Sequence, residues 1–295
     1  MDVPPLVSAT DPQAQDALRT LDRRMREYYN RPAIDAYFET AHSFNATWSP
    51  PIDHWVIREK AAALGGGGGG AAAVLDLGCG SGHSWLNLKD TGVRYTGLDV
   101  SESQILKNRT AYGGDPTFVA ASLYQSGLPD QAFDLTFSTY VLEHLVWPHL
   151  FLREMFRLTR PGGWMIIICP HFRPFGRIPS FPYGKTVLTL KQRLRGGHLL
   201  AAAKHLYRRN LAYPKMLAAR FPRGTAPFLI NLEPTCLSGT YYADNDAVYL
   251  TDRDELVSGL TALGATDETA HVRAEFVRPQ PAASTCFIIA RRDHT

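Results

Sequence analysis

The sequence predicts an α/β protein in which helices cover both faces of a mostly parallel β-sheet. Between residues 71 and 169, short β-rich runs alternate with helical stretches at about 20-residue spacing, which favours a parallel sheet. The run over 163–169 is apolar at nearly every position, as in strands that are buried on both faces. With 295 residues, 45% hydrophobic and 20% charged, the chain can bury a sizeable core. This composition excludes collagen-like, coiled-coil and wholly disordered proteins.

The central segment, 73–170, contains most of this predicted sheet. A helix over 101–112 begins with Ser101 as its N-cap and has an acid in its first turn. A second helix, over 149–160, is expected to end at Pro161-Gly162-Gly163. The predicted strands are 73–77, 93–100, 117–122, 133–139 and 163–169.

Three segments lie before and after this core. Residues 1–64 are helix-forming and aromatic, and we expect them to form an N-terminal cap. Residues 65–72 consist of glycine and alanine and are expected to be a flexible linker. Residues 171–250 are rich in basic residues and are expected to form an insertion that covers the substrate.

The C-terminal segment, 251–295, is expected to complete the core sheet. A helix over 252–265 is expected to close at Gly264. Two strands, 269–277 and 284–292, are separated by a proline-rich turn and are predicted to pair as an antiparallel hairpin.

Charge, cysteines and terminal sequence exclude several classes of protein. The net charge is +3, with 31 basic and 28 acidic residues, which by itself indicates no particular partner. The four cysteines form no CxxC pair, so neither a metal site nor a redox motif is predicted, and Cys79 and Cys169 are expected to be buried. The N-terminus lacks the features of a signal peptide and the longest apolar run is too short for a bilayer span, which predicts a cytoplasmic protein.

A glycine-rich turn is the most informative local motif. The strand over 73–77 carries Asp76 and is followed by Gly78, Gly80 and Gly82 at alternate positions. Glycine permits positive φ and lets the backbone approach a ligand at the carboxyl edge of a parallel sheet. The next strand ends at Asp99, an acid that can accept hydrogen bonds from both hydroxyls of a ribose. The motif therefore predicts binding of an adenosine cofactor.

The spacing distinguishes between two kinds of adenosine cofactor. The dinucleotide fingerprint GxGxxG would require glycine at position 83, which is His83, and the chain contains no Tyr-x-x-x-Lys sequence. Both observations weaken an oxidoreductase interpretation. An acid two residues before the first glycine instead suits a cofactor that ends in a cationic methionine and carries no phosphate.

These motifs resemble those of the class I S-adenosylmethionine-dependent methyltransferases, over most of 73–170 and again over 252–292. The matching sequences, in the order found in that family, are DLGCGSG (76–82), LDVS (98–101), LPDQAFDLTFSTYVLEHL (128–145) and LTRPGGWMIII (158–168). The resemblance implies a Rossmann-like, seven-stranded, mostly parallel sheet with helices on both faces and an antiparallel C-terminal hairpin. It also implies S-adenosyl-L-methionine as the cofactor.

The resemblance further implies roles for individual residues. Asp76, Gly78, Gly80 and Gly82 would line the methionine end of the cofactor, with Asp99 at the ribose. The other implied cofactor-binding residues are Cys79 and His83 in the glycine loop, Val100 beside Asp99, Ser122 and Leu123 at the adenine, and Thr139 and Tyr140 near the sulfonium. The chain departs from many relatives at Ala121-Ser122, where they carry an acid, so Ser122 or a backbone carbonyl would have to bind the adenine amino group.

Two histidines are candidate general bases, because a hydroxyl nucleophile loses its proton during methyl transfer. His144 belongs to the LEHL sequence, where it is either a base or a residue that packs against the sheet. His171 follows the strand over 163–169, at the edge where substrate should enter. We expect His171→Ala to lower turnover more than cofactor affinity.

The insertion suggests the kind of substrate. Three interpretations are compatible with its basic and apolar residues over 171–223: a solvated helical pair, a lid for an anionic substrate, or a basic amphipathic helix in peripheral contact with an anionic membrane. Nucleic acid ranks below these because no recognition motif is present. Candidate substrate-binding residues are Trp48, Arg173, Asp246 and Tyr249.

We therefore predict a methyltransferase that acts on an oxygen of a small molecule, such as a sugar or a secondary metabolite, including anionic or lipid-linked acceptors. The alternatives are a non-catalytic adaptor with the same fold and a nucleotide-dependent oxidoreductase. The intact glycine loop and Asp99 argue against the adaptor.

Overall fold

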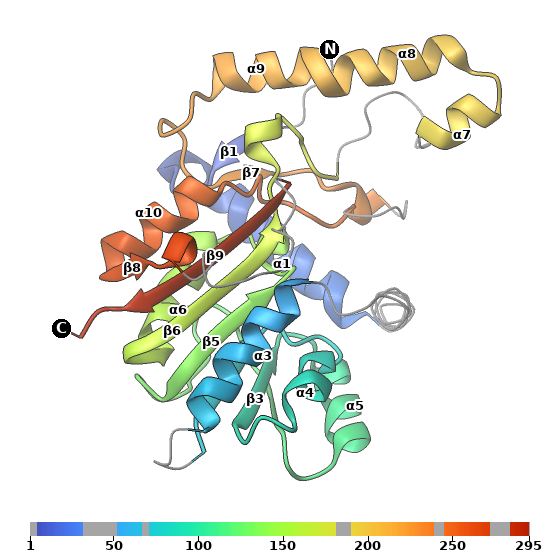
Figure 1. The fold of residues 1–295 in the computed structure, drawn as a ribbon. Coiled ribbons are helices and arrows are strands. Elements are labelled where there is room, and N and C mark those ends of the chain that lie inside the picture. The colour runs from blue at the N-terminus through green and yellow to red at the C-terminus, as the bar shows by residue number, and fades with distance from the viewer. Residues whose placement is uncertain are drawn as a thin grey trace.

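A seven-stranded β-sheet forms the centre of the computed structural model, which describes residues 5–31, 52–66, 71–180, 190–238, 245–271 and 284–294 (Figure 1). The strand order is β4-β3-β2-β5-β6-β9-β8. Strands β2 to β6 pair in parallel, whereas β9 is antiparallel to both of its neighbours. The bounds are β2 Ala73–Leu77, β3 Arg94–Asp99, β4 Thr117–Ala120, β5 Phe133–Thr139, β6 Thr159–Pro170, β8 Ala265–Asp267 and β9 Thr285–Arg292. The predicted fold class is confirmed.

The strand order reverses between β2 and β5. From β2 the chain continues outward through β3 to β4, and it then crosses back so that β5 pairs with the other side of β2. Loops at the carboxyl ends of strands on either side of such a reversal separate from one another and leave a crevice in which ligands bind. The glycine loop after β2 lies at this point.

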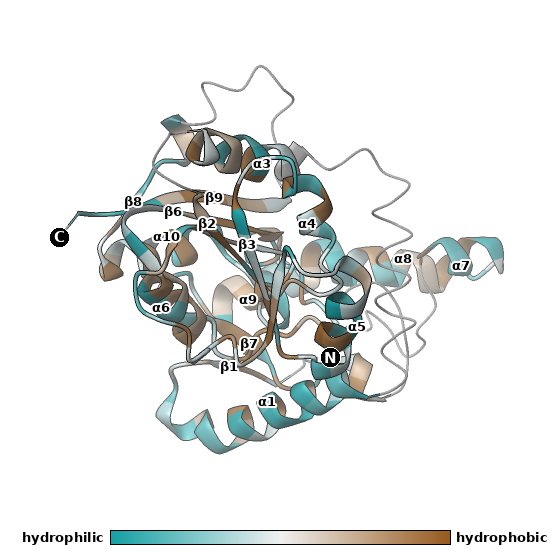
Figure 2. Ribbon diagram, turned by 90° about the horizontal axis from the view of Figure 1, so that it is seen from below, coloured by the Kyte–Doolittle hydropathy of each residue, from teal (hydrophilic) through white to brown (hydrophobic). Residues whose placement is uncertain are grey.

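Helices cover both faces of the sheet, as the alternation of buried residues along the strands requires. In β6, Met165 and Ile167 belong to one buried cluster and Ile166 and Ile168 to the other. The first cluster includes residues of α1 (Gln15–Asn30), α6 (Pro148–Leu158) and α10 (Arg253–Leu263). The second includes residues of α3 (Ile52–Gly65), α4 (His83–Leu88) and α5 (Glu102–Tyr112). Figure 2 shows the apolar strands between these helical layers.

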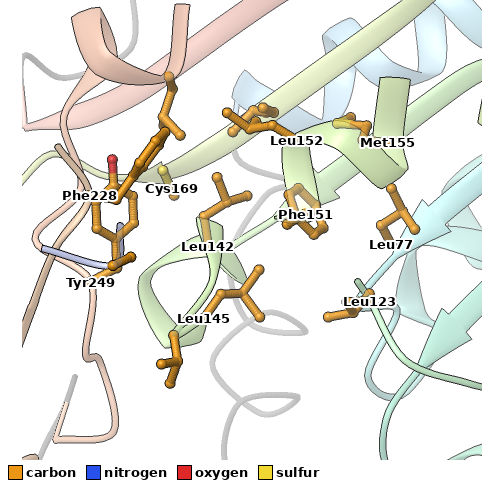
Figure 3. Packing of buried hydrophobic residues seen from close by; sticks show 14 of the residues in the cluster. Leu77, Leu123, Leu142, Leu145, Phe151, Leu152, Met155, Cys169, Phe228 and Tyr249 are labelled. Atoms are coloured by element: carbon orange, nitrogen blue, oxygen red, sulfur yellow. The ribbon is translucent and has the colours of Figure 1, made fainter. Parts of the chain in front are cut away.

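The larger cluster connects the sheet to the residues that line the candidate site. Figure 3 shows Phe151 of α6 between Leu77 of β2 and Leu142, which follows β5, with Met155 of the same helix above Leu77. These four side chains are completely buried. Leu123 and Leu145, at the edge of the same cluster, also line the cavity described below. The packing therefore fixes the walls of the cavity relative to the sheet.

The insertion after β6 forms a second unit that contacts the N-terminal strand. Strand β7 (Leu229–Asn231) pairs antiparallel with β1 (Leu6–Ser8). Between β6 and β7 the chain forms an arm of helices that extends beyond the layers around the sheet (Figures 1 and 2). The arm, residues 190–220, consists of α7 (Leu190–Arg195), α8 (Leu199–Tyr207), the π-helical turn η5 (Arg208–Ala212) and α9 (Tyr213–Arg220). Short 3-10 turns are η1 (Pro12–Ala14), η3 (Leu142–His144), η4 (Arg173–Phe175) and η6 (Thr235–Ser238).

The structure differs from the expected boundaries at α5 and α6. Helix α6 ends at Leu158, before Pro161, because the β-branched Thr159 is buried and begins β6 opposite Phe133. Ser101 precedes α5 as its N-cap residue, but its hydroxyl makes no capping hydrogen bond. Its backbone N–H donates instead to Asp99 Oδ1 at 2.9 Å.

The expected C-terminal hairpin is displaced along the chain. Gly264 adopts a left-handed conformation that ends α10, and β8 follows at once over Ala265–Asp267. Residues 269–271 are helical rather than extended, and 272–283 lie outside the described residues. Thr269 still contacts β9, because its Oγ1 accepts a hydrogen bond from the Ile289 N–H at 2.9 Å.

At the other end of the core, the expected boundary between cap and linker at residues 64 and 65 falls inside a helix, and residues 67–70 of the expected linker lie outside the described residues. Helix α3 extends through Gly65 and buries Val56, Ile57 and Ala61 in the cluster on one face of the sheet. It therefore belongs to the helical layers of the core. All four cysteines are free and buried. Within the described part of the chain, no helix combines the length and apolar character needed to cross a membrane.

Candidate active site

A cavity of about 250 Å³ lies at the carboxyl ends of β2, β3, β4 and β5, where the strand order reverses. Its floor is the glycine loop after β2, and its sides come from the residues that follow the other three strands. One wall is helix α1. The lining residues are Asp22, Met25, Arg26, Tyr29, Gly78, Cys79, Gly80, Ser81, His83, Ser84, Asp99, Val100, Ser122, Leu123, Tyr124, Thr139, Tyr140, Val141, His144 and Leu145.

The glycine loop has a backbone that other residues would strain. Gly78 and Gly82 have φ of +83° and +73°. A Cβ at Gly78 would lie 2.4 Å from Val141 Cγ2, and one at Gly82 would lie 2.9 Å from the Phe118 ring. Helix α5 holds the loop from the other side, because Asn108 Nδ2 donates to the Gly80 carbonyl at 2.7 Å. The loop is therefore rigid and presents its backbone to the cavity.

We expect Gly78→Ala to destabilise the protein by about 2 kcal/mol, because it combines a positive φ with overlap against Val141. Urea unfolding of the variant measures this loss. Gly224→Ala is the control, since Gly224 has a φ of +84° but nothing within 4 Å of its Cβ position. An equal loss in both variants would contradict the close contact with Val141, and Gly78→Ala/Val141→Ala should recover part of the difference.

Asp99, at the end of β3, presents a buried carboxylate to the cavity. Its Oδ2 accepts a hydrogen bond from the Gly80 N–H at 2.8 Å, and its Oδ1 accepts one from the Ser101 N–H at 2.9 Å. Burial raises the pKa of this carboxyl, while the backbone N–H groups oppose the shift. Each carboxylate oxygen can accept a further hydrogen bond. Asp99 therefore fixes the glycine loop and can also bind two hydroxyl groups of a ligand.

Asp76, at the end of β2, has one buried carboxylate oxygen that accepts no hydrogen bond. Its Oδ2 accepts a hydrogen bond from the Tyr95 hydroxyl at 2.9 Å, whereas its buried Oδ1 has no hydrogen-bond partner. Burial raises the pKa of Asp76 to about 7, against the opposing effect of the Ser84 and Tyr95 hydroxyls. A buried carboxylate with unused acceptor capacity suits a cationic ligand group above it. This is what the amino end of a methionine-derived cofactor requires, so the donor set fits that cofactor.

The raised pKa of Asp76 makes stability depend on pH. The folded state holds the Asp76 proton more tightly than the unfolded chain, whose carboxyl has a pKa of 3.8. The contribution to stability is therefore full below about pH 4 and falls, by at most about 1.4 kcal/mol per pH unit, as the pH rises towards 7. We expect Asp76→Asn to flatten this decline in ligand-free protein. Chemical unfolding between pH 4 and pH 8 measures it, and the exposed Asp90→Asn is the control. Parallel profiles for Asp76→Asn and wild type would contradict the assignment.

The ends of β4 and β5 form the remaining sides of the cavity. Ser122 accepts a hydrogen bond from the Tyr124 N–H at 3.1 Å, which leaves its own hydroxyl proton free to be donated. Tyr140 directly follows β5 and adopts a φ of +56°. This conformation is uncommon for a residue other than glycine and is concentrated at functional sites. The Tyr140 side chain is 43% exposed at the cavity.

His144, Tyr29 and Asp246 form a polar cluster at the edge of the cavity. The Tyr29 hydroxyl donates to Asp246 Oδ2 at 2.8 Å, and His144 Nδ1 lies 3.6 Å from the same oxygen. His144 Nε2 lies 3.6 Å from Oε1 of the buried Glu143. Tyr29 and His144 line the cavity, whereas Asp246 lies behind them and is 2% exposed. A carboxylate behind an imidazole orients the ring and stabilises the cation that forms when the ring accepts a proton.

Most of the sequence-predicted cofactor residues line this one cavity. The exceptions are Asp76, which belongs to β2, and Gly82, the last glycine of the loop. Cys79 and His83 both line the cavity, where burial raises the pKa of the Cys79 thiol and lowers that of His83.

Three other candidates lie elsewhere. Arg173 and Tyr249 were expected to bind substrate, but both side chains are buried and meet at Glu255 of α10. Arg173 Nη1 lies 3.0 Å from Oε1 of that carboxylate, and the Tyr249 hydroxyl donates to Oε2 at 2.6 Å. These two contacts hold the insertion to α10. His171 accepts a hydrogen bond from the Arg253 N–H at 3.2 Å and is not among the described lining residues. Trp48 lies outside the described residues.

Sequence reasoning missed the wall formed by α1. Met25 and Arg26 each lie three or four residues from both Asp22 and Tyr29, so the four residues share a helix face. This periodicity was visible in the sequence, but not its position against β4 and β5. Arg26 pairs with Asp22 at 2.9 Å and lies over the Tyr124 ring. Asp22 thus brings a carboxylate to the wall beside Tyr124. Tyr124 follows positions 121–122 closely in the sequence, and at those positions this chain lacks the acid that many relatives carry.

The fold and the site together define a class of protein. A sheet with one antiparallel strand, a glycine loop after β2, an acid after β3 and no dinucleotide glycine at position 83 are the features of a class I S-adenosylmethionine-dependent methyltransferase domain. Residues 75–167 match the family described as Methyltransferase domain. Among the described residues, no group of three or more His, Cys, Asp or Glu is placed to hold a metal ion.

Individual relatives share only part of their length with this chain. A Mycolicibacterium smegmatis protein named as a probable S-adenosylmethionine-dependent methyltransferase is 32% identical over 37% of this chain and 44% of its own. A ubiquinone biosynthesis O-methyltransferase of Maricaulis maris is 29% identical over 45% of this chain and 53% of its own. The chain thus spans about half the length of these curated relatives. A methyltransferase structure from Mesorhizobium loti aligns with 82% of this chain and 99% of its own, at 18% identity and a TM-score of 0.47.

Proposed function

We propose that the protein transfers a methyl group from S-adenosylmethionine to an oxygen of a small hydroxylated molecule. The observation that carries this proposal is the single cavity that brings together the glycine loop, Asp99 and the His144–Asp246 pair. The first two elements suit the cofactor, and the third suits removal of a proton from an acceptor.

The cofactor would lie along the carboxyl edge of β2, β3 and β4. The backbone of Gly78 and Gly80, with Asp76 beneath, would bind its methionine end. Asp99 would accept hydrogen bonds from both ribose hydroxyls. The adenine would lie between Leu123 and the loop after β3, with Ser122, Val100 and Asp22 at its edge, and the sulfonium would face Thr139 and Tyr140.

His144 is the proposed general base. When bound, S-adenosylmethionine supplies a methyl group on a sulfonium sulfur. The cofactor would supply the methyl group to the acceptor oxygen and leave as the thioether, and His144 would accept the hydroxyl proton on its imidazole. Asp246 and Tyr29 are positioning residues, since they contact each other and the ring rather than the reacting atoms. Holding the oxygen in line with the methyl carbon supplies much of the rate enhancement.

The lining near His144 indicates the acceptor class. Met25, Tyr29, Tyr140 and Leu145 provide apolar and aromatic surface, so a hydroxylated secondary metabolite suits this wall better than a highly charged molecule. A sugar hydroxyl remains compatible with the stacking surface of Tyr140. The name of the Maricaulis maris relative, an O-methyltransferase, also supports oxygen as the acceptor atom.

A transfer assay tests the proposal. The protein is incubated with methyl-labelled S-adenosylmethionine and separate panels of phenols, sugars, amines and activated carbon acids. We expect label in O-methylated products of the hydroxyl panels, identified by mass spectrometry, and none with His144→Gln. Transfer only to amines or carbon acids would contradict the oxygen assignment, and transfer that is unaffected in His144→Gln would contradict the base.

A further inference from the structure

An apolar stripe runs along the arm on a side that the rest of the protein leaves exposed. Leu199, Leu200, Leu206 and Tyr207 of α8 are 68%, 71%, 40% and 58% exposed. At 100° per residue these side chains, with the exposed Ala203, fall within an arc of about 120°. Leu211 follows Tyr207 by four residues, shares its side of the helix and is 44% exposed. Exposed apolar surface of this regularity marks an interaction site.

The α9 end of the arm already has a partner. Tyr213 and Leu217 of α9 are buried in a cluster with Leu6 and Leu229 of the small β1–β7 sheet. The arm is thus anchored at its α9 end, while α8 extends away from the core (Figure 1). None of the described residues that line the cofactor cavity belongs to the arm. The stripe is therefore neither core packing nor part of the cavity wall.

The charges of the arm identify the partner. No Asp or Glu occurs between residues 155 and 232. Lys204 borders the stripe, and Arg208 and Arg209 follow it. The basic residues of the arm are Lys191, Arg193, Arg195, Lys204, Arg208, Arg209, Lys215 and Arg220. A second copy of the chain on this surface would place two acid-free arms against each other, and their like charges would oppose association.

We propose that the arm binds the surface of an anionic lipid bilayer, with the stripe inserted at the level of the headgroups. An amphipathic helix with an apolar side and basic flanks lies in the plane of such an interface. The leucines enter the acyl boundary, and Tyr207 has the amphipathic ring that favours the interface. Each Lys or Arg near the surface strengthens binding on the order of fivefold through the negative surface potential. The site would place the enzyme where apolar hydroxylated acceptors concentrate.

Flotation of the full chain with vesicles tests this proposal. Vesicles contain either phosphatidylcholine alone or equal parts of phosphatidylcholine and phosphatidylglycerol. We expect wild type to float with the anionic vesicles and at least tenfold less with the neutral ones. Leu200→Asp/Leu206→Asp should lose at least tenfold of this binding, since it removes the apolar contact and adds repulsion. Leu106→Asp is the matched control, because Leu106 of α5 is 65% exposed outside the arm; it should bind as wild type does.

A second variant separates charge from apolar contact. Lys204→Gln/Lys215→Gln keeps the stripe and should weaken binding to anionic vesicles on the order of tenfold or more. Circular dichroism and cofactor binding confirm that each variant is folded. Wild type that stays in the aqueous fraction, equal flotation with neutral vesicles, or an unaffected stripe variant would overturn the proposal. A concentration-dependent dimer that the stripe variant abolishes, without vesicle binding, would assign the surface to self-association and would also overturn it.

Discussion

Replacing Asp99 with alanine is expected to weaken binding of S-adenosylhomocysteine about 100-fold. The carboxylate is the proposed acceptor for both ribose hydroxyls, and a hydrogen bond to a charged group contributes about 1.5–3 kcal/mol. The substitution also removes the partner of the Gly80 N–H, which holds the glycine loop in place. Titration calorimetry measures the affinity directly, without a known methyl acceptor.

Two comparisons isolate the role of the Asp99 carboxylate. Asp99→Asn keeps the size and one acceptor oxygen, so it should bind more tightly than the alanine variant and less tightly than wild type. Asp115→Ala removes an exposed carboxylate in a loop outside the cavity and should leave affinity unchanged. Unfolding curves establish that each variant is folded. Wild-type affinity in a folded Asp99→Ala would contradict the ribose assignment.

Replacing His144 with glutamine is expected to lower kcat at least 100-fold while leaving affinity for S-adenosylhomocysteine unchanged. A positioned general base contributes about 10²–10⁴ to the rate of a proton-transfer step. Glutamine preserves the approximate size and polarity of the side chain but cannot accept the proton. Asp246→Asn should lower kcat by about tenfold, because the imidazole loses the carboxylate that orients it.

Chemical rescue distinguishes a base from a residue that merely packs. His144→Gly should regain part of its turnover when imidazole is added, whereas a structural defect would not respond. His171→Ala is the comparison within the same fold, since His171 contacts Arg253 and Phe175 rather than the cavity. We expect His171→Ala to lower kcat less than His144→Gln does. If His171→Ala abolishes turnover and His144→Gln does not, the two assignments must be exchanged.

Local sequence patterns predicted the sheet and the floor of the cavity well. The strand over Ala73–Leu77, the positive φ of Gly78 and the acid at the end of β3 all depend on residues close together in the chain. Their relative positions follow from the rule that parallel strands end at one edge. The glycine loop and Asp99 could therefore be placed together without a structure.

Contacts between distant residues were not predictable in the same way. Tyr29 and Asp246 meet across 217 positions in the chain, and neither carries a motif that indicates the other. Arg173 follows β6 at the expected edge, yet its partner Glu255 lies 82 residues later. The local sequence around a basic residue does not show whether it binds a ligand or forms a buried ion pair. Only the tertiary packing distinguishes these two roles.

The antiparallel C-terminal pair was predicted, but its first strand was placed too late in the chain, for a different reason. The residues over 269–277 have a β-rich composition, but β8 begins as soon as Gly264 ends α10. A strand of three residues, Ala265–Asp267, is too short to give a recognisable period-two pattern. The side chain of Thr269 then bonds to the backbone of β9, and residues 272–277 of the predicted strand lie outside the described residues.

Thermal unfolding of the wild-type protein with S-adenosylhomocysteine, with NADH and without ligand tests the central claim most directly. At about 100 times its dissociation constant, a ligand that binds only the folded state adds about 2.7 kcal/mol to stability. This corresponds to a rise in Tm of roughly 5 °C for a domain of this size. We expect that rise with S-adenosylhomocysteine and no change with NADH. An equal rise with NADH, or no rise with S-adenosylhomocysteine, would contradict the assignment of the cavity to a methyl-donor cofactor.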